Sequence, residues 1–283
     1  MEKAIRKYWP IFVLPTLIAF VIGFLWPFIW GIALSFCKFQ TVNNVKFVGL
    51  SNYMKIGYDD TFGHAFWFTV LFTIVTVVII NVIAFMIAVA LTRAVKSRNI
   101  FRTIFFAPNL IGGIVLGYIW QSLLNGLLQK AGKPLLALDA TEGFWGLVIL
   151  VAWQQIGYMA IIYIAGLQNV SPDLIEAAEI DGASHWQVLK SVKIPMVMPS
   201  ITICTFLTLS NGFKMFDQNL SLTGGEPAKS TQMLALNIYE TYYSRSGMQW
   251  KGIGQAKAVV FFLIVVVISL IQLRFTRSKE VQA

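Results

Sequence analysis

Six long apolar runs dominate this chain of 283 residues and limit what it can fold into. A membrane hydrocarbon core about 30 Å thick needs roughly 20 mostly apolar residues in each helix that crosses it. The runs have that length, whereas strands of a membrane barrel would alternate in polarity over about 10 residues. The sequence therefore predicts an all-α, polytopic membrane protein, one domain over residues 1–283, with six spans at about 11–36, 66–92, 103–128, 144–167, 198–222 and 253–273.

Composition supports this prediction, since hydrophobic residues make up 57% of the chain and charged residues only 12%. Soluble globular proteins carry roughly 25% charged residues. The first run is preceded by Lys3, Arg6 and Lys7, as a secretory signal would be, but it is too long and no small-residue cleavage site follows it. We therefore interpret it as an uncleaved first span.

Lysine and arginine residues indicate how the spans are oriented, because cytoplasmic loops carry an excess of both. With a cytoplasmic amino terminus, twelve of them lie at inner segments, among them Arg93, Lys96 and Lys279, and nine lie in longer outer segments. Both termini are then cytoplasmic. The net charge of +9 is spread over both sides of the membrane, so anionic lipid explains the inner charges better than nucleic acid does, and no nucleic-acid partner is expected.

The sequence offers few residues for catalysis or metal binding. Its two histidines, His64 and His185, and its two cysteines, Cys37 and Cys204, lie far apart along the chain. Neither a nucleophile with its base nor a set of metal ligands can be assembled from them. We expect no catalytic residues, no metal site and no enzymatic activity.

A polar segment at 169–197 separates the fourth and fifth runs. Ser171, followed by a proline, predicts the start of a short helix that stops near Gly182. Ser184 and Gln187 have the spacing of a capping box, which predicts a second short helix ended by a proline at position 195. The segment is therefore expected to hold two short helices joined at a glycine on the cytoplasmic side.

The residue types in this segment match a known pattern. It resembles the loop shared by membrane subunits of bacterial ATP-binding-cassette importers, carried here by Glu176, Ala177, Ala178, Asp181, Gly182, Ala183, Val192, Ile194 and Pro195. Further stretches, at 165–183 and 213–227, and Pro108 with Trp120, are similar to the carbohydrate-type permeases that include the first permease of the maltose and glycerol-phosphate importers. The resemblance covers essentially the whole chain.

This resemblance implies a heteromeric importer in the bacterial cytoplasmic membrane. The chain would pair with a second homologous permease, two ATP-binding subunits and an extracytoplasmic solute-binding protein, within the lipid bilayer. ATP and Mg²⁺ would be bound by the partner ATPase subunits, and no cofactor is expected in this chain. The resemblance places the contact with the ATPase at Glu176, Ala177, Ala178, Asp181, Gly182, Ala183 and Pro195, and implies that this permease forms half of the path for a carbohydrate, most simply an oligosaccharide.

A polar stripe in the fifth predicted span is the candidate solute path. Its members recur every three or four residues, which places them on one helical face: Thr205, Thr208, Asn211, Lys214, Gln218 and Ser221. Asp217, Phe213 and Phe216 lie beside the stripe, and Gln154, Gln155 and Tyr158 of the fourth span are weaker candidates for the same path.

Two interpretations of the stripe remain open. A lysine deep in a span costs roughly 3 kcal/mol, so Lys214 is expected to face the interior or water and to pair with Asp217. In the first interpretation this pair is structural and the threonines join helices. In the second, the stripe lines the solute path, where amides and charges bond to hydroxyl groups and an aromatic ring stacks on a sugar.

Two other functions are also compatible with a polytopic membrane protein. An ion-coupled secondary transporter would have intramembrane charges, but usually also inverted repeats, which the sequence lacks. A sensor subunit could bind an ATPase without moving a solute. Uptake that survives loss of the ATPase would favour the first alternative, and ATPase association without uptake would favour the second.

Overall fold

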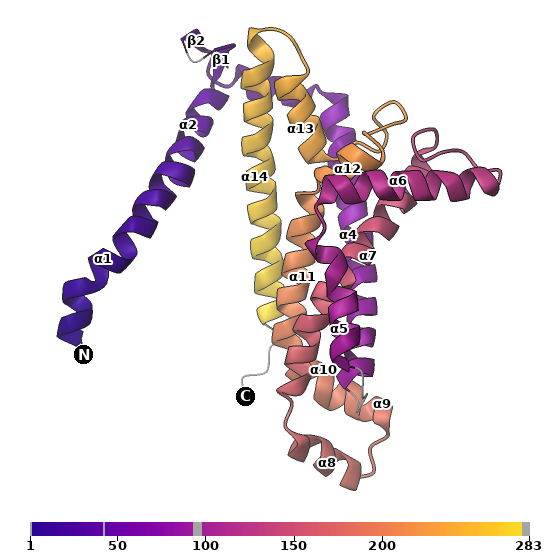
Figure 1. Ribbon diagram of the computed structural model, residues 1–283. Helices are drawn as coiled ribbons and strands as arrows, with labels where there is room; N and C mark the ends of the chain where they lie inside the picture. The colour runs from indigo at the N-terminus through magenta and orange to yellow at the C-terminus, as the bar shows by residue number, and fades with distance from the viewer. Residues whose placement is uncertain (1, 42, 93–97, 279–283) are drawn as a thin grey trace. The chain divides into compact units, whose positions relative to one another are not determined.

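The computed structural model describes residues 2–41, 43–92 and 98–278, which form helices and a short antiparallel hairpin (Figure 1). Arg93, Lys96 and Lys279 lie outside the described residues. The first elements are α1 (Glu2–Phe20), the π-helix η1 (Val21–Leu25), α2 (Trp26–Ser35), β1 (Cys37–Phe39), β2 (Val45–Phe47), α3 (Ser51–Gly57), α4 (Asp60–Thr92), α5 (Arg98–Phe106) and the 3-10 helix η2 (Ala107–Leu110). The remainder are α6 (Gly113–Lys130), α7 (Ala140–Gln168), α8 (Pro172–Ile180), α9 (His185–Val188), the π-helix η3 (Leu189–Lys193), α10 (Ile194–Met196), α11 (Met198–Phe213), α12 (Asp217–Leu222), α13 (Leu234–Tyr243) and α14 (Met248–Arg277).

The chain divides into two compact units, one of residues 1–60 with 238–262 and the other of residues 61–237 with 263–283. Four helical segments are long and apolar enough to cross a membrane: Ile11–Ser35, Asp60–Thr92, Ala140–Gln168 and Met248–Arg277. Two bent pairs of helices raise the number to six if each pair is one span. The all-α, polytopic prediction is therefore confirmed.

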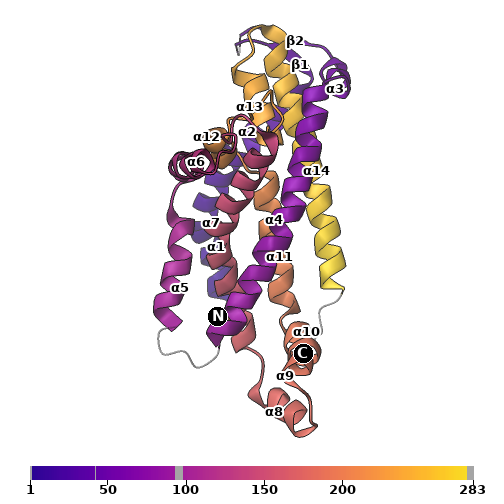
Figure 2. The same cartoon turned by 90° about the vertical axis from the view of Figure 1, so that its right-hand side faces the viewer.

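The third predicted span, 103–128, is not one straight helix. Its two parts, 100–110 and 113–130, are bent by 99°, so that α6 runs crosswise to α5 in Figure 1 and is seen nearly end-on in Figure 2. The break follows Pro108, which has no N–H for the helix ladder, and the chain is extended at Ile111 and Gly112. A count of apolar residues does not detect such a break.

The fifth predicted span, 198–222, is also interrupted. The helix α11 ends at Phe213, and α12 starts at Asp217 after a non-helical turn. The segment His185–Met196 meets α11 at 69°. The other spans have the predicted cores, but α4 begins six residues before the predicted start at residue 66 and α14 begins five before residue 253.

In the first unit, side chains of α3 and α14 hold neighbouring segments together. Asn52 of α3 donates from Nδ2 to the carbonyl oxygens of Ser35 at 2.8 Å and Cys37 at 2.9 Å, which fixes the start of the hairpin. Lys257 of α14 is fully buried, and its Nζ lies 2.8 Å from Asp59 Oδ2. The same ammonium donates to Thr241 Oγ1 of α13 at 2.9 Å. One buried cation therefore joins three segments of this unit.

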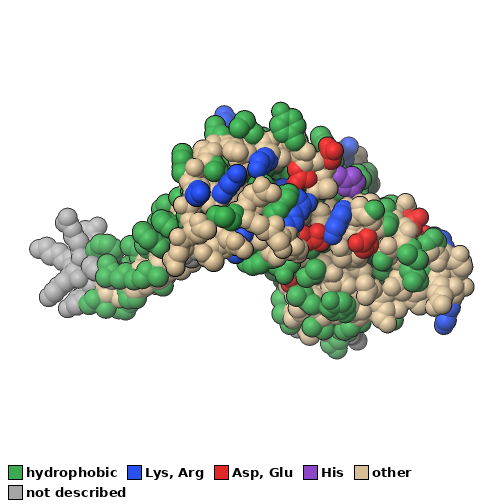
Figure 3. All heavy atoms as spheres, turned by 90° about the horizontal axis from the view of Figure 1, so that it is seen from above, with side chains coloured by type: hydrophobic (Ala, Val, Ile, Leu, Met, Phe, Trp, Pro, Cys, Tyr) green, Lys and Arg blue, Asp and Glu red, His purple; other side chains and the backbone are tan. Residues whose placement is uncertain are grey.

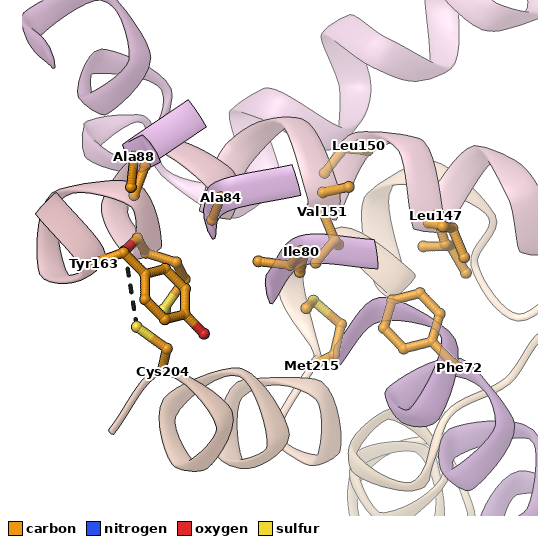
Figure 4. Packing of buried hydrophobic residues seen from close by; sticks show 14 of the residues in the cluster. Phe72, Ile80, Ala84, Ala88, Leu147, Leu150, Val151, Tyr163, Cys204 and Met215 are labelled. Atoms are coloured by element: carbon orange, nitrogen blue, oxygen red, sulfur yellow. Dashed lines mark hydrogen bonds between the residues drawn. The ribbon is translucent and has the colours of Figure 1, made fainter. Parts of the chain in front are cut away.

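In the second unit, α4, α7 and α11 pack around an apolar core (Figure 4). Ala84 and Ala88 of α4 are one turn apart and fully buried, so small side chains let neighbouring helices approach closely. A polar network crosses the same three helices. Tyr163 donates to Asn81 Oδ1 at 2.7 Å, and Asn81 donates to Thr208 Oγ1 at 3.0 Å. The core thus fixes α11, which leads into the break at Lys214.

The start of α7 is fixed by a side-chain cap. Asp139 accepts hydrogen bonds from the backbone N–H of Glu142 at 3.1 Å and of Thr141 at 2.7 Å. These two bonds stabilise the carboxylate and hold the pKa of Asp139 below its ordinary value. Nearby, Lys133 Nζ lies 2.8 Å from Oε1 of Glu142, which belongs to the first turn of α7.

Large apolar side chains are exposed along the spans, and hydrophobic groups also form patches on the end of the molecule seen in Figure 3. Phe12 is 78% exposed and Trp67 69%. Lipid is as apolar as these side chains, so helices in a bilayer have no hydrophobic reason to bury them.

Candidate functional site

A polar cavity of about 350 Å³ opens in the second unit at the break between α11 and α12. It is lined by Asn109, Gln154, Gln155, Asn211, Lys214, Met215, Phe216, Asp217 and Gln218. These residues come from η2, α7, the end of α11, the turn after it, and α12. Two interrupted helices and one continuous helix therefore bring the lining together.

The residues at the break between α11 and α12 form part of the wall of this cavity. Lys214 ends α11 with φ −84° and ψ 6°, and Met215 and Phe216 continue outside any helix. Backbone groups released from a helix within a membrane protein need other polar surroundings. An interruption beside a polar cavity meets that requirement.

Amide side chains link the wall across the cavity. Gln218 donates from Nε2 to Gln154 Oε1 at 2.8 Å, and Gln154 donates to the carbonyl oxygen of Ile111 at 3.1 Å. Asn211 and Gln155 approach each other at 3.5 Å between Nδ2 and Oε1. Because each amide has both donors and an acceptor, this wall can bond to hydroxyl groups in either direction.

The two charged residues of the lining do not pair. Lys214 is exposed, and no ion pair joins it to Asp217 in the part of the chain that the structure describes, which corrects the expected pairing. Residues three apart face each other only on a continuous helix, and here the helix ends between Phe213 and Asp217. Both charges remain available at the cavity.

The structure brings six of the eight candidate path residues together and separates two. Phe213 is buried and lines a different, apolar cavity with Val70 and Ile268. Tyr158 packs against Phe106, with ring centroids 6.2 Å apart. Phe213 and Tyr158 therefore do not line the amide-lined cavity, whereas the break after Phe213 turns Lys214, Phe216 and Asp217 toward it.

Asn109 lines the cavity but was not among the residues expected from the sequence. It follows Pro108 in the third predicted span. An amide next to a proline in an apolar run is a signal for an interrupted helix with a polar neighbour, and this signal could have indicated the position.

The segment 169–197 forms the two short helices that were predicted. Ser171 caps α8 by accepting from the N–H of Asp173 at 3.3 Å. After α8, Gly182 has φ +82°, a backbone conformation that other residues adopt at a cost. The N–H groups of Gly182 and Ala183 bond to the carbonyls of Glu179 and Ala178, both at 3.0 Å, which closes the helix as a Schellman motif.

The second short helix begins as predicted and continues further. Ser184 and Gln187 form the capping box that starts α9. Pro195 does not end the helix, because the π-helical turn Leu189–Lys193 precedes it and the chain stays helical to Met196. A wider turn changes the hydrogen-bond pattern in which the missing proline N–H would have taken part.

One side of this segment is packed and the other is exposed. Val188 is buried, and Ile175 and Val192 contact the core of the second unit. A cavity of about 520 Å³ lies beneath the segment and is lined by Val89, Thr92, Leu167, Ile175, Glu179, His185, Val188, Leu189 and Lys193.

The exposed side of the segment carries large apolar groups. Ile180 is 85% exposed, Trp186 69% and Leu174 46%. Glu176, Ala177, Asp181 and Gly182 are exposed, while Ala178, Ala183 and Pro195 are half-buried. The described residues contain no group of three or more His, Cys, Asp or Glu side chains that could hold a metal ion.

Comparison with known proteins gives consistent matches. Residues 80–281 match the family described as "Binding-protein-dependent transport system inner membrane component". The chain is 44% identical to the probable starch degradation products transport system permease protein of Thermoanaerobacterium thermosulfurigenes, over 97% of this chain and 95% of the relative. It is 31% identical to the multiple sugar-binding transport system permease protein of Streptococcus mutans, over 99% of each.

A solved structure has a similar fold. A chain of the bacterial alginate ABC transporter, in complex with an alginate pentasaccharide-bound periplasmic protein, matches with a TM-score of 0.80. The match covers 98% of this chain and 97% of the other, at 19% sequence identity. At that identity the match shows the fold alone.

Proposed function

Because this chain belongs to the family of binding-protein-dependent transport system inner membrane components, we propose that it forms half of the translocation path of an ATP-driven importer. It is a membrane-embedded transport component and not an enzyme. The proposed solute is a carbohydrate, most simply an oligosaccharide. Two relatives named for starch degradation products and for multiple sugars support this choice.

The amide-lined cavity at the break between α11 and α12 is the observation that carries the solute path. Asn109, Gln155 and Asn211 offer donors and acceptors of the kind that sugar hydroxyls require. Phe216 adds an aromatic face to the same lining. The volume of the cavity, about 350 Å³, lies in the range of small-molecule sites.

The charges of the lining favour a neutral solute. Lys214 and Asp217 have opposite signs, and both lie at the cavity. An anionic solute would gain from the lysine and lose to the aspartate, whereas a neutral one can hydrogen-bond to both. The proposed solute is therefore an uncharged carbohydrate.

The proposed partners are a second homologous permease, two ATP-binding subunits and an extracytoplasmic solute-binding protein. The structure of the bacterial alginate ABC transporter in complex with a periplasmic protein supports the last of these partners. ATP and Mg²⁺ would be bound by the ATPase subunits, and this chain would supply none of their ligands.

The segment 169–197 is the proposed contact with the ATPase. Its outer side exposes Leu174, Ile180 and Trp186, and its inner side packs against the core through Ile175 and Val192. Motion of the ATPase can reach the spans only through a contact whose free energy differs between the two states. A rigid, capped segment anchored to the bundle is suited to that purpose.

The proposed orientation follows from this contact. The segment 169–197 would face the cytoplasm of a bacterial cell, together with both termini. The loops on the other side, including the one after α12, would face the binding protein.

Copurification tests the proposed assembly. The tagged chain would be extracted from its native membrane in mild detergent, and the copurifying chains identified by mass spectrometry. We expect a P-loop ATPase and a second permease. Recovery of other membrane complexes without any ATPase would contradict the proposal and would direct attention to ion-coupled transport.

A further inference from the structure

Two glycines of α6 lie directly against α12. A Cβ atom added at Gly113 would meet Asp217 Cβ at 2.7 Å and Gln218 Nε2 at 2.9 Å. A Cβ added at Gly117 would overlap Ser221 Oγ and lie 2.8 Å from Ser221 Cβ. The two glycines are one helical turn apart, so they form a smooth strip that admits α12 at close range.

The helix α12 carries part of the cavity wall. Asp217 and Gln218 of its first turn line the cavity, and Gln218 donates to Gln154 on α7. Ser221 Oγ donates to the carbonyl oxygen of Asp217 at 2.7 Å, which ties the contact with Gly117 to the turn that lines the cavity.

A second bond holds the same two helices together. Gln121, one turn after Gly117 on α6, donates from Nε2 to the carbonyl oxygen of Leu222 at 2.8 Å. This carbonyl is at the end of α12, where the helix has no partner of its own for it. Close packing at one end and a hydrogen bond at the other fix α12 on α6.

We propose that Gly113 and Gly117 are positioning residues that set the separation between the two walls of the polar cavity. They act through α12, because a larger side chain at Gly113 or Gly117 must move Asp217 or Ser221 away from α6. The consequence for solute selection rests on the proposed function. The effect on the distance between Gln218 and Gln154 does not rest on the proposed function, because it follows from the packing of α12 on α6.

Alanine at these positions isolates the steric effect from helix stability. Alanine favours a helix more than glycine does, so Gly117→Ala strengthens α6 as a helix while it crowds α12. Gly126 lies in the same helix with open space around it, and Gly126→Ala is the matched control.

Chemical cross-linking measures the proposed separation in the full chain. Cysteines replace Gln154 and Gln218, and alanines replace Cys37 and Cys204, so that a short bifunctional methanethiosulfonate reagent can join only the two walls. In membranes we expect Gly117→Ala to lower the cross-linked fraction on the order of tenfold, because an added methyl group in a packed contact forces a backbone shift. Gly126→Ala should leave it unchanged.

A pair of compensating substitutions gives the decisive comparison. Gly117→Ala with Ser221→Gly moves the small residue from one helix to the other and should restore the cross-link. If Gly117→Ala does not accumulate in the membrane, Ser221→Thr enlarges the same contact by one methyl group and should lower the cross-link in the same way. An unchanged cross-link in the crowded variants would overturn the proposal.

Uptake by variants with native glutamines separates this inference from the proposed function. With radiolabelled maltose and maltotriose as probes in the assembled transporter, we expect Gly117→Ala to change the apparent KM ratio of the two sugars and the size swap to restore it. A changed cross-link with an unchanged ratio would support the positioning role and contradict the proposed solute path. No change in either measurement would overturn the positioning role itself.

Discussion

Asn211 is the residue on which the proposed solute path depends most. It lies in the last turn of α11, lines the cavity and approaches Gln155 of the opposite wall. Thr205 belongs to the same sequence stripe, yet it lies two turns earlier and does not line the cavity. The two residues therefore separate a role at the cavity from a role in helix packing.

Replacement of Asn211 should weaken solute capture without uncoupling the ATPase. We expect Asn211→Ala to raise the apparent KM for uptake about tenfold, the effect of one or two lost hydrogen bonds. ATP hydrolysis stimulated by the binding protein should persist. The matched control Thr205→Ala should keep the normal KM. A normal KM in Asn211→Ala would leave the residue with a packing role alone.

Helical spacing predicted part of the cavity lining, on both sides of the break between α11 and α12. Asn211, Lys214 and Gln218 were expected on one face, and all three line the cavity. Phe213 was expected beside them, but it lies before the break at Lys214 and lines a different, apolar cavity. Helical spacing alone does not reveal where a polar cavity permits a helix to stop.

At the scale of elements, the segment from α8 to α10 has well-defined local structure. The helix end near Gly182 and the capping box at Ser184 were both predicted from residue types, because each depends on neighbours within a few positions. The π-helical turn before Pro195 was not predicted, since it depends on how the chain enters α11.

Gly182 offers a test of the segment as the ATPase contact. Alanine at φ +82° costs about 1–2 kcal/mol and should reorient α8 against α9. We expect Gly182→Ala to reduce copurification of the ATPase while the chain still inserts in the membrane.

Gly49 provides the control for this test. It has φ +57° and open space where the Cβ of an alanine would lie, so Gly49→Ala imposes a comparable strain outside the segment. Equal loss of the ATPase in both variants would indicate a general defect and would count against the contact.

In the first unit, the ion pair between Lys257 and Asp59 holds separate segments together. Lys257→Met should leave Asp59 without its buried cation, and removal of one partner from a buried pair costs roughly 3–5 kcal/mol. We expect a lower midpoint of thermal unfolding in detergent. The double change Lys257→Met with Asp59→Leu should recover part of the loss, and equal midpoints for the single and double variants would refute this account.

At the scale of the whole molecule, the length of the apolar runs was enough to predict an all-α, polytopic membrane protein. Membrane thickness imposes that length, so the prediction depends on a single physical requirement. The bend of 99° before α6 and the break before α12 escaped prediction. The bend follows Pro108 and so had a local signal, whereas the position of α12 depends on a tertiary contact, its close approach to α6 at Gly117.

Uptake by the purified assembly in proteoliposomes tests whether this chain belongs to an ATP-driven carbohydrate importer. The complex would be supplied with its binding protein and a panel of radiolabelled oligosaccharides, with ATP and Mg²⁺ inside or outside the vesicles. We expect accumulation of at least one oligosaccharide only when ATP can reach the ATPase subunits, and loss of that accumulation in Gly182→Asp. Accumulation driven by an ion gradient without ATP, or ATP hydrolysis with no uptake of any carbohydrate, would contradict this expectation.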